Sequence, residues 1–570
     1  VKRNIYPEDF INYLWKSLLK NHPHDSICGC SHNDVHAQME DRYDRFFNLA
    51  DTLVEEGLTL VSNHIDRSDV TSQDHIILAC NFSEMTCSRV IETIVEKPAD
   101  EEREIKNIVD KDKKEIDFEI IEANRKYKNV YSPINLPGVI YVNEYRIRLF
   151  VKNLLPYSIN AFIVKTRINK EFKAFRESKD TVLSKILEND FVKVEISESG
   201  KICIYNKISQ RYHHDILEII DEEDTGDSYV NHNKGLPPIS TKDIWPRIVK
   251  ISDSKISQQY RLIYKMMIPE DFDFENNIRS KNLLEHEIAI DVILDKDCKW
   301  VRFDFHFDNI AKSHRLRAIV NTGISSDHTY SSAPFDVIKR DRKFTLEGTH
   351  NGDQPNNGFV DIMDERSSVA ILTNGIYEYK HYLDPEGKLA FTLLRATYGF
   401  GYYQFDGGQC RRHIDASIAI MPHEGDHTDA KLQILHKQFQ CGTLAGCYPA
   451  DTRKFSGGRP ALQDSDIKEI FYRDDPYPEW KMEKETTFFD IKGTGAAITA
   501  VKKALNKEGY IIRLYNSSQS NQRVDMHFFI PVKSIHLCSL DEEIIETREI
   551  NNDSTIEIRP KEIITLLIDQ

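Results

Sequence analysis

The chain has 570 residues, 40% hydrophobic and 29% charged, which is the composition of a soluble globular protein with three or four domains. Its net charge of −16 argues against non-specific nucleic-acid binding, which needs a basic surface, and no apolar run approaches the roughly 20 residues that span a bilayer. We therefore expect neither nucleic acid nor a membrane as a partner, whereas neutral ligands such as sugars are compatible with this composition.

Residues 1–67 are predicted to be helical. Pro7 and the two acidic residues after it suit a first helical turn, and apolar residues then recur at helical spacing. A second helix is expected after Ser31-His32-Asn33-Asp34, which resembles a capping box. Its apolar face continues for roughly thirty residues, a length typical of a helix in a bundle.

From about residue 74 the apolar period changes to two, which predicts strands. Residues 189–205 show the pattern of a hairpin that turns at Gly200. We therefore expect a multidomain, mainly β protein in which an N-terminal helical-bundle segment is followed by β-sandwich domains. The expected ranges are 1–67 for the helical segment, 74–170 for a small β domain, 183–430 for a large β-sandwich domain and 431–570 for a C-terminal β domain.

The ten cysteines have neither a framework spacing nor a Cys-x-x-Cys pair, which indicates reduced thiols and a cytoplasmic location. The first residues contain neither Met nor the apolar stretch of a signal peptide. We expect the chain to be a piece of a longer protein.

A short loop between the two helical segments carries a His-Asp pair, in the sequence Asn21-His22-Pro23-His24-Asp25-Ser26-Ile27-Cys28-Gly29-Cys30-Ser31. His24 can offer a ring nitrogen to Zn²⁺, and Asp25 can accept hydrogen bonds from sugar hydroxyls. Pro23 stiffens the approach and Gly29 permits a tight exit. Taken alone, His24 is more simply a histidine that hydrogen-bonds a helix end, and Asp25 a cap of the next turn.

This loop, together with Asp34-Val35-His36 and Arg42-Tyr43, resembles the bacterial α-mannosidases of glycoside hydrolase family 38. A second block is similar to the segment that opens the large β-domain of that family: Asp221-Glu222-Glu223-Asp224-Thr225-Gly226-Asp227-Ser228-Tyr229. A looser third match comprises Gly375-Ile376-Tyr377-Glu378-Tyr379, Leu393-Leu394-Arg395 and Gly408-Gln409-Cys410. The resemblance implies that the large sandwich is galactose-mutarotase-like.

The resemblance also implies one Zn²⁺ per active site, which grips two adjacent hydroxyls of a mannose. In the family the ion is bound by a His-x-Asp pair, a nucleophilic Asp and a later His, and this later His maps onto His24. The substrate-contacting Asp maps onto Asp25, while the Gly-Asp-x-Tyr block would put Tyr229 and Asp227 at the rim of the pocket. A retaining glycosidase needs a nucleophile and an acid/base carboxylate roughly 5 Å apart.

The α/β domain that carries both catalytic carboxylates in the family, along with a His-x-Asp-x-x-Trp segment, precedes the His-Asp loop. Here only 23 residues precede His24. Six His-x-Asp triplets occur, and none is followed by Trp three residues after the Asp: His32/Asp34, His64/Asp66, His213/Asp215, His306/Asp308, His413/Asp415 and His427/Asp429. They indicate an acidic composition, and we expect no catalytic carboxylate in this chain.

Other conspicuous residues favour structural roles. Cys28 and Cys30 form a Cys-x-Cys pair without a second pair nearby, which favours packing over zinc binding. Arg395 lies in a strand among leucines, where a buried ion pair is the simpler expectation. The acidic run 221–227 suits a solvated loop or a Ca²⁺ site, although its spacing is not that of an EF-hand.

The sequence thus predicts the C-terminal portion of a zinc-dependent retaining α-mannosidase. Its substrate would be an α-mannoside oligosaccharide or a mannosyl conjugate, and mannosylglycerate hydrolases share this framework. The alternative is a non-catalytic β-sandwich protein that binds carbohydrate or mediates assembly. A homodimer is compatible with either function.

Overall fold

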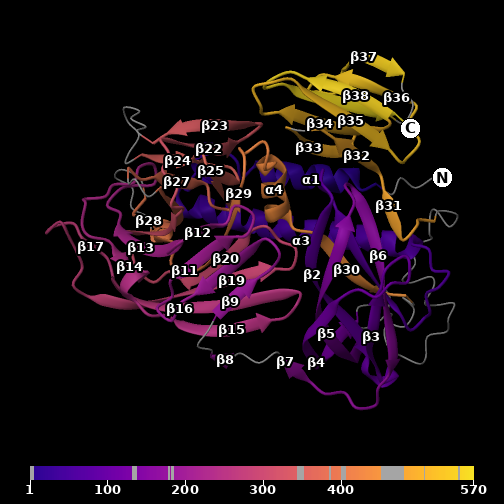
Figure 1. Ribbon diagram of the computed structural model, residues 1–570, viewed down its shortest axis with the longest axis horizontal. Coiled ribbons are helices and arrows are strands. Elements are labelled where there is room, and N and C mark those ends of the chain that lie inside the picture. Colours follow the sequence, from indigo (N-terminus) through magenta and orange to yellow (C-terminus); the bar gives the residue numbers. More distant parts are fainter. Residues whose placement is uncertain are drawn as a thin grey trace.

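The computed structural model describes residues 6–130, 138–176, 180–181, 185–342, 352–383, 387–399, 406–450, 481–493, 495–505, 507–549 and 553–569. Three helices come first: α1 (Glu8–Leu19), α2 (His24–Ile27) and α3 (Asn33–His64). Three β-domains follow, and Figure 1 shows the large one at the left, the small one at the lower right and the C-terminal one at the upper right. The predicted class, a helical segment followed by β-sandwich domains, is confirmed.

The small β-domain is a sandwich of a five-stranded and a four-stranded sheet. In the first sheet the order is β3-β6-β1-β30, and β31 also pairs with β6: β1 (His75–Asn81), β3 (Arg103–Val109), β6 (Ser158–Ile168), β30 (Leu444–Pro449) and β31 (Glu485–Thr487). In the second sheet the order is β2-β5-β4-β7: β2 (Cys87–Pro98), β4 (Phe118–Val130), β5 (Gly138–Leu154) and β7 (Phe175–Arg176). Ile77, Val95 and Ile147 share its core, as expected where the apolar faces of two sheets meet.

Two strands from the range predicted for the C-terminal domain belong to this first sheet instead. β30 and β31 pair with β1 and β6, although more than 300 residues separate β1 from β30 along the chain. All seven residues of β1 are buried, so its second edge requires a hydrogen-bonding partner, and β30 supplies it. The C-terminal sandwich therefore begins only after β31.

The large β-domain packs a ten-stranded sheet against a six-stranded and a four-stranded sheet. The ten-stranded sheet comprises β23 (Asp336–Asp341), β22 (His328–Ala333), β25 (Phe359–Met363), β26 (Ser368–Asn374), β29 (His413–His423), β20 (Val301–Asp308), β19 (Leu283–Asp295), β16 (Ser257–Pro269), β15 (Arg247–Asp253) and β8 (Asp180–Thr181), in that order. The six-stranded sheet comprises β14 (Ile239–Ser240), β13 (Leu217–Glu223), β21 (His314–Asn321), β28 (Lys388–Ala396), β27 (Glu378–His381) and β24 (Asp353–Pro355). The four-stranded sheet comprises β12 (Arg211–His213), β11 (Ile202–Asn206), β10 (Val192–Ile196) and β9 (Lys185–Glu188), and a small ribbon pairs β17 (Phe272–Asp273) with β18 (Ile278–Arg279).

Alternation along the strands determines which side chains enter the core of this domain. Phe303, Phe305 and Phe307 of β20 are buried between the sheets, so the residues between them face outward. The predicted hairpin is present as β10 and β11, and Gly200 adopts a φ of 82° at its turn. Helix α4 (Leu432–Cys441) covers part of the outer face of the ten-stranded sheet through Leu432.

The C-terminal β-domain packs a three-stranded sheet against a five-stranded one. The first comprises β32 (Phe489–Lys492), β35 (Gln522–Phe528) and β38 (Asp553–Ile558), and the second β33 (Ala496–Lys503), β34 (Tyr510–Asn516), β39 (Ile563–Asp569), β36 (Ser534–Cys538) and β37 (Ile544–Glu549). Phe489, Leu514 and Ile556 lie in the core between these two sheets.

The helical segment contacts all three β-domains. Lys503 donates to Glu8 of α1 from the C-terminal domain, and Leu58 of α3 packs on the outer face of the five-stranded sheet of the small domain. Arg412 donates to Glu40 of α3 from the large domain, at 3.0 Å. The helices are therefore in contact with each of the three sandwiches.

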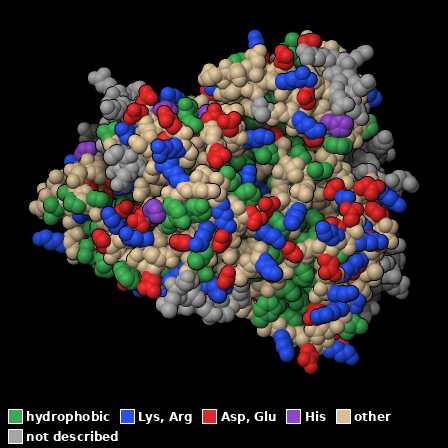
Figure 2. Space-filling view, in the orientation of Figure 1, with side chains coloured by type: hydrophobic (Ala, Val, Ile, Leu, Met, Phe, Trp, Pro, Cys, Tyr) green, Lys and Arg blue, Asp and Glu red, His purple; other side chains and the backbone are tan. Residues whose placement is uncertain are grey.

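Among the described residues, no helix has the length and apolar character needed to cross a bilayer. All ten cysteines are free thiols. Acidic and basic side chains are interspersed over the face seen in Figure 2.

Buried histidines make the stability of the fold depend on pH. Burial lowers the pKa of His75 to about 3 and the pKa values of His286, His381 and His436 to about 4. An unfolded histidine titrates near pH 6.5, so between pH 6.5 and 4 the unfolded chain binds more protons than the folded one. These four histidines therefore lower the free energy of unfolding as the pH falls through this window.

We expect the urea midpoint to be lower at pH 5 than at pH 7, and the difference to shrink in His436→Gln. His436 lies on α4, where its ring packs against Phe359 and Nδ1–H donates to the Leu432 carbonyl at 2.9 Å. One such histidine accounts for about 2 kcal/mol between pH 6.5 and 5. The exposed His22→Gln is the control. An unchanged pH dependence in His436→Gln would contradict the assignment.

Candidate functional site

The predicted His-Asp loop contains one turn of helix, α2, which begins at His24 and ends at Ile27. Pro23 precedes it with an extended ψ of 141°, and Gly29 follows it in the left-handed region with a φ of 76°. The Gly29 amide donates to the carbonyl of Ser26 at 3.1 Å and the Cys30 amide to that of Asp25 at 2.8 Å, a Schellman ending. Proline and glycine thus act as predicted, one at each end of the turn.

His24 points into solvent beside Asp25. The side chain of His24 is 88% exposed, and its Nε2 lies 3.5 Å from Oδ1 of Asp25. An imidazole so exposed can bind a ligand from outside the chain through either ring nitrogen. The two residues that the resemblance implies as metal ligand and sugar contact are therefore adjacent and accessible.

Buried Asn21 attaches the turn to α3. Its Nδ2 donates to the carbonyl of Met39 at 3.0 Å, and its Oδ1 accepts from Nε of Arg42 at 2.5 Å. Asn21 and Arg42 both belong to the motif that resembles family 38, and in the structure they hydrogen-bond each other and so attach the turn to α3.

Tyr229 of the large domain reaches Asp25 across 204 residues of sequence. Its hydroxyl donates to Oδ1 of Asp25 at 2.6 Å, and this hydrogen bond raises the pKa of Tyr229 to about 12 because ionising the phenol would face a carboxylate. Tyr229 stays half-exposed. The structure therefore brings together three predicted site residues, His24, Asp25 and Tyr229.

Asp227 serves the loop that carries Tyr229. Its Oδ1 accepts hydrogen bonds from the backbone amides of Tyr229 and Val230, both at 2.9 Å. This arrangement turns the chain so that Tyr229 faces α2. Sugar contact by Asp227, which would depend on its second oxygen, stays a prediction.

Arg395 ties this loop to the sheet behind it. Its Nε donates to Oδ2 of buried Asp224 at 2.6 Å and its Nη2 to the carbonyl of Asp227 at 2.6 Å. Gly226 must be a glycine here, since a Cβ would lie 1.9 Å from the carbonyl oxygen of Val230. The ion pair expected for Arg395 is thus present, and much of the acidic run forms internal contacts.

A fully buried network lies deeper in the large domain. Oδ2 of Asp221 lies 2.5 Å from Nδ1 of His314, and Arg279 pairs with the same carboxylate. Burial opposes ionisation of Asp221, but His314 and Arg279 outweigh it and lower its pKa. Nε2 of His314 bonds Oδ1 of Asn309 at 2.9 Å, and Asn309 Nδ2 donates to the carbonyl of Gln409 at 2.8 Å.

The His-Asp turn and the blocks 221–229, 393–395 and 408–410 of the family resemblance are therefore connected in space. The 221–229 block contacts the His-Asp turn through Tyr229. The same block contacts residues 393–395 through Arg395, and residues 408–410 through the network that ends at Gln409. Cys30 is buried against the carbonyl of Ser228, and burial raises the pKa of its thiol, which favours packing over metal binding as predicted.

His24 fits zinc as one ligand of a larger set. Imidazole nitrogen is a common zinc donor, but within the described ranges His24 belongs to no group of three metal-ligating side chains. The remaining ligands would have to come from elsewhere.

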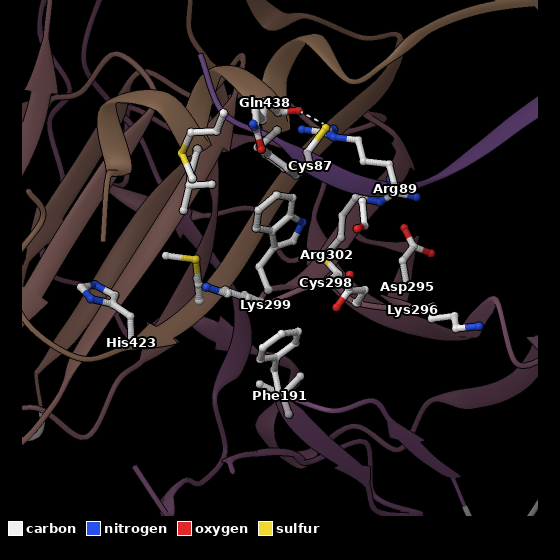
Figure 3. A pocket seen from close by; sticks show the side chains of 18 of the residues that line it. Cys87, Arg89, Phe191, Asp295, Lys296, Cys298, Lys299, Arg302, His423 and Gln438 are labelled. Carbon is white, nitrogen blue, oxygen red and sulfur yellow. Dashed lines mark hydrogen bonds between the residues drawn. The ribbon is translucent and has the colours of Figure 1, made fainter. Parts of the chain in front are cut away.

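A well-defined cavity lies elsewhere, between the small and large β-domains beside α4. Its volume is about 680 Å³, and Figure 3 shows Arg89, Phe191 and Arg302 around it. None of the predicted site residues lines it. It is therefore not the sugar site that the sequence predicts.

Family comparisons agree with this geometry. Residues 187–399 match the glycosyl hydrolases family 38 C-terminal domain, and residues 495–566 match the family 38 C-terminal β-sandwich domain. The chain belongs to glycosyl hydrolase family 38.

Similar proteins extend the match to almost the whole chain. A Halalkalibacterium halodurans protein named "Putative mannosylglycerate hydrolase" is 21% identical over 98% of this chain and 63% of its own length. The crystal structure of an α-mannosidase from Enterococcus faecalis V583 shares the fold with a TM-score of 0.82 and 22% identity, over 99% of this chain and 64% of that one. A second Enterococcus faecalis family 38 structure gives the same TM-score over 67% of its chain. This chain thus spans slightly under two thirds of the first two.

The Tyr229–Asp25 contact predicts a change in tyrosine ionisation. Asp25→Asn removes the carboxylate that opposes the phenolate, so Tyr229 should ionise near pH 10 instead of about 12. Difference absorbance at the tyrosinate band between pH 9 and 11 should rise by one tyrosine in Asp25→Asn.

The double variant Asp25→Asn/Tyr229→Phe provides the control and should lack this increase. Circular dichroism at each pH checks that the fold persists. An equal increase in the double variant would assign the signal to another tyrosine and contradict the contact.

Proposed function

We propose that this chain is the C-terminal part of a zinc-dependent retaining glycoside hydrolase that acts on terminal α-mannosides. His24 would be one zinc ligand, and Asp25 and Tyr229 would form part of the sugar pocket. The nucleophile and the acid/base would come from a further part of the intact protein.

The observation that carries the proposal is that α2 presents an exposed histidine next to a carboxylate whose position is fixed by a hydrogen bond. His24 is exposed while its neighbour Asp25 is held by Tyr229 from a different domain. A histidine needed only to cap a helix end would hydrogen-bond a backbone amide or carbonyl of that end. When bound, zinc would hold and polarise adjacent hydroxyls of the sugar. Asp25 would accept a hydrogen bond from a hydroxyl, and Tyr229 would keep this carboxylate oriented.

Exposed apolar side chains on the same helices support the proposal that a further protein surface covers the site. A 32-residue helix normally buries a full apolar stripe, yet α3 buries only Met39, Leu58, Ser62 and His64. Large apolar side chains stay exposed on α1, α2 and α3: Phe10, Tyr13, Trp15, Leu19, Ile27, Val35, Phe47 and Val54. Such a concentration is typical of an interface, and the catalytic part of the intact protein is the proposed occupant.

The substrate is proposed at the level of a mannosyl group. The relatives named as an α-mannosidase and as a mannosylglycerate hydrolase share mannose and differ in the group attached to it. The free thiols are compatible with a cytoplasmic enzyme, and a homodimer stays a prediction.

The alternative function, a non-catalytic carbohydrate-binding or assembly protein, uses the same exposed helices as a docking surface. The two functions differ in what the gene encodes upstream. A reading frame that continues for roughly the length of an α/β domain and includes His-x-Asp-x-x-Trp favours the hydrolase.

The product of the whole reading frame should hydrolyse an aryl α-mannoside or mannosylglycerate and lose this activity on chelation. His24→Ala should lower kcat/KM at least about a hundredfold and lower the zinc content of the active site, because the ion loses one of its protein ligands. His22→Ala, an exposed histidine two residues earlier, is the matched control and should keep both.

Activity that survives His24→Ala with unchanged zinc content would remove His24 from the ligand set. A whole product that is inactive on both substrates, with and without added zinc, would favour the non-catalytic alternative.

A further inference from the structure

Two of the His-x-Asp triplets meet on the outer face of the ten-stranded sheet. Strands β20 and β29 are antiparallel, and their register puts His306 opposite Asp415 and Asp308 opposite His413. The phenylalanines that alternate with these residues on β20 are buried in the core, so all four polar side chains belong to the opposite face. Two imidazoles and two carboxylates therefore form a compact square.

The inner nitrogens of both histidines converge on one carboxylate. Nδ1 of His306 lies 2.6 Å and Nε2 of His413 lies 3.2 Å from Oδ1 of Asp415. The ligand atoms of these three residues all lie within 4.8 Å of one another. Zinc with bonds of about 2.0–2.2 Å separates its ligands by roughly 3.3 Å, so only small side-chain shifts would seat the ion.

A further carboxylate lies near each of the outer nitrogens. Nδ1 of His413 lies 2.7 Å from Asp308, and Nε2 of His306 lies 3.4 Å from buried Asp291. Arg261 fixes Asp291 with two hydrogen bonds of 2.6 Å. A carboxylate behind an imidazole is the usual arrangement around metal-binding histidines, because it fixes the tautomer and leaves the inner nitrogen as a donor to the ion.

Charge gives a second reason to expect a cation. If neutral His413 donates its one N–H to Asp308, its inner nitrogen presents a lone pair to the lone pairs of Asp415 at 3.2 Å. A proton or a metal ion between them relieves this opposition. Asp415 and His413 are more than half exposed and His306 about one third, so an ion can enter from solvent.

We propose that His306, His413 and Asp415 bind a divalent transition-metal ion, Zn²⁺ in the first instance, with Asp308 and Asp291 as positioning residues. This site is separate from the zinc proposed at His24, since the ligands lie on the sheet of the large domain. The ion would cross-link β20 and β29 and leave a fourth position to water. Its function would be structural, because it joins neighbouring strands whose inner faces form the core.

The test uses the 570-residue chain, freed of metal with a chelator and then dialysed against Zn²⁺. Elemental analysis should give one zinc per chain, and Co²⁺ in its place should give visible absorption bands of a nitrogen- and oxygen-ligated ion. His413→Ala and Asp415→Asn should abolish stoichiometric binding. Asp308→Asn should weaken binding about 10- to 100-fold in competition with a chromophoric chelator.

His24→Ala and His22→Ala are the matched controls and should keep the zinc, which separates this site from the proposed active site. Zinc should also raise the thermal midpoint of the parent chain and not that of Asp415→Asn, which preserves side-chain shape. Absence of bound zinc would overturn the proposal. Zinc that persists in both His413→Ala and Asp415→Asn would overturn it as well.

Discussion

A helix of four residues closes too few hydrogen bonds to be stable by itself, so the position of His24 depends on contacts outside α2. Three of them are decisive. Asn21 fastens the entry to α3, Gly29 closes the exit, and Tyr229 holds Asp25 from another domain. The proposed metal ligand is consequently positioned by residues that would never touch the metal.

The contact between Tyr229 and Asp25 in turn requires the loop behind it. Asp227 shapes that loop through backbone amides, and Arg395 holds it against Asp224. Asp224 is almost fully buried, so its charge needs a partner, and loss of Arg395 would leave it uncompensated. The acidic run 221–227, which the sequence pattern alone makes a solvated loop, is therefore a structural support, and Tyr229 is its exposed tip.

The sequence predicts well those features that depend on short-range pattern. The hairpin at Gly200 and the break between α1 and α3 follow from glycine, proline and periodicity. The pairing of β1 with β30 is different, since it depends on which strand edge is left free once the sheets have formed. No local pattern near residue 444 distinguishes a strand of the small domain from one of the C-terminal domain.

The pairing of strands in the sheet also explains why the triplets at 306 and 413 do not reveal a metal site in the sequence. Each is an unremarkable alternation of polar and apolar residues, and four similar triplets occur elsewhere. Register alone brings these two into one square, because a slip of one residue would turn either pair into the core.

The two histidine sites illustrate opposite solutions to metal binding. His24 is exposed and, within the described residues, belongs to no group of three metal-ligating side chains, so its affinity for zinc depends on ligands supplied by another surface. The outer nitrogens of His306 and His413 already lie beside carboxylates, which lowers the entropy lost when an ion binds. In this chain zinc should therefore occupy the sheet before His24. Zinc content alone is consequently a poor measure of the site at α2, and only its dependence on His24 reports on the proposed hydrolase.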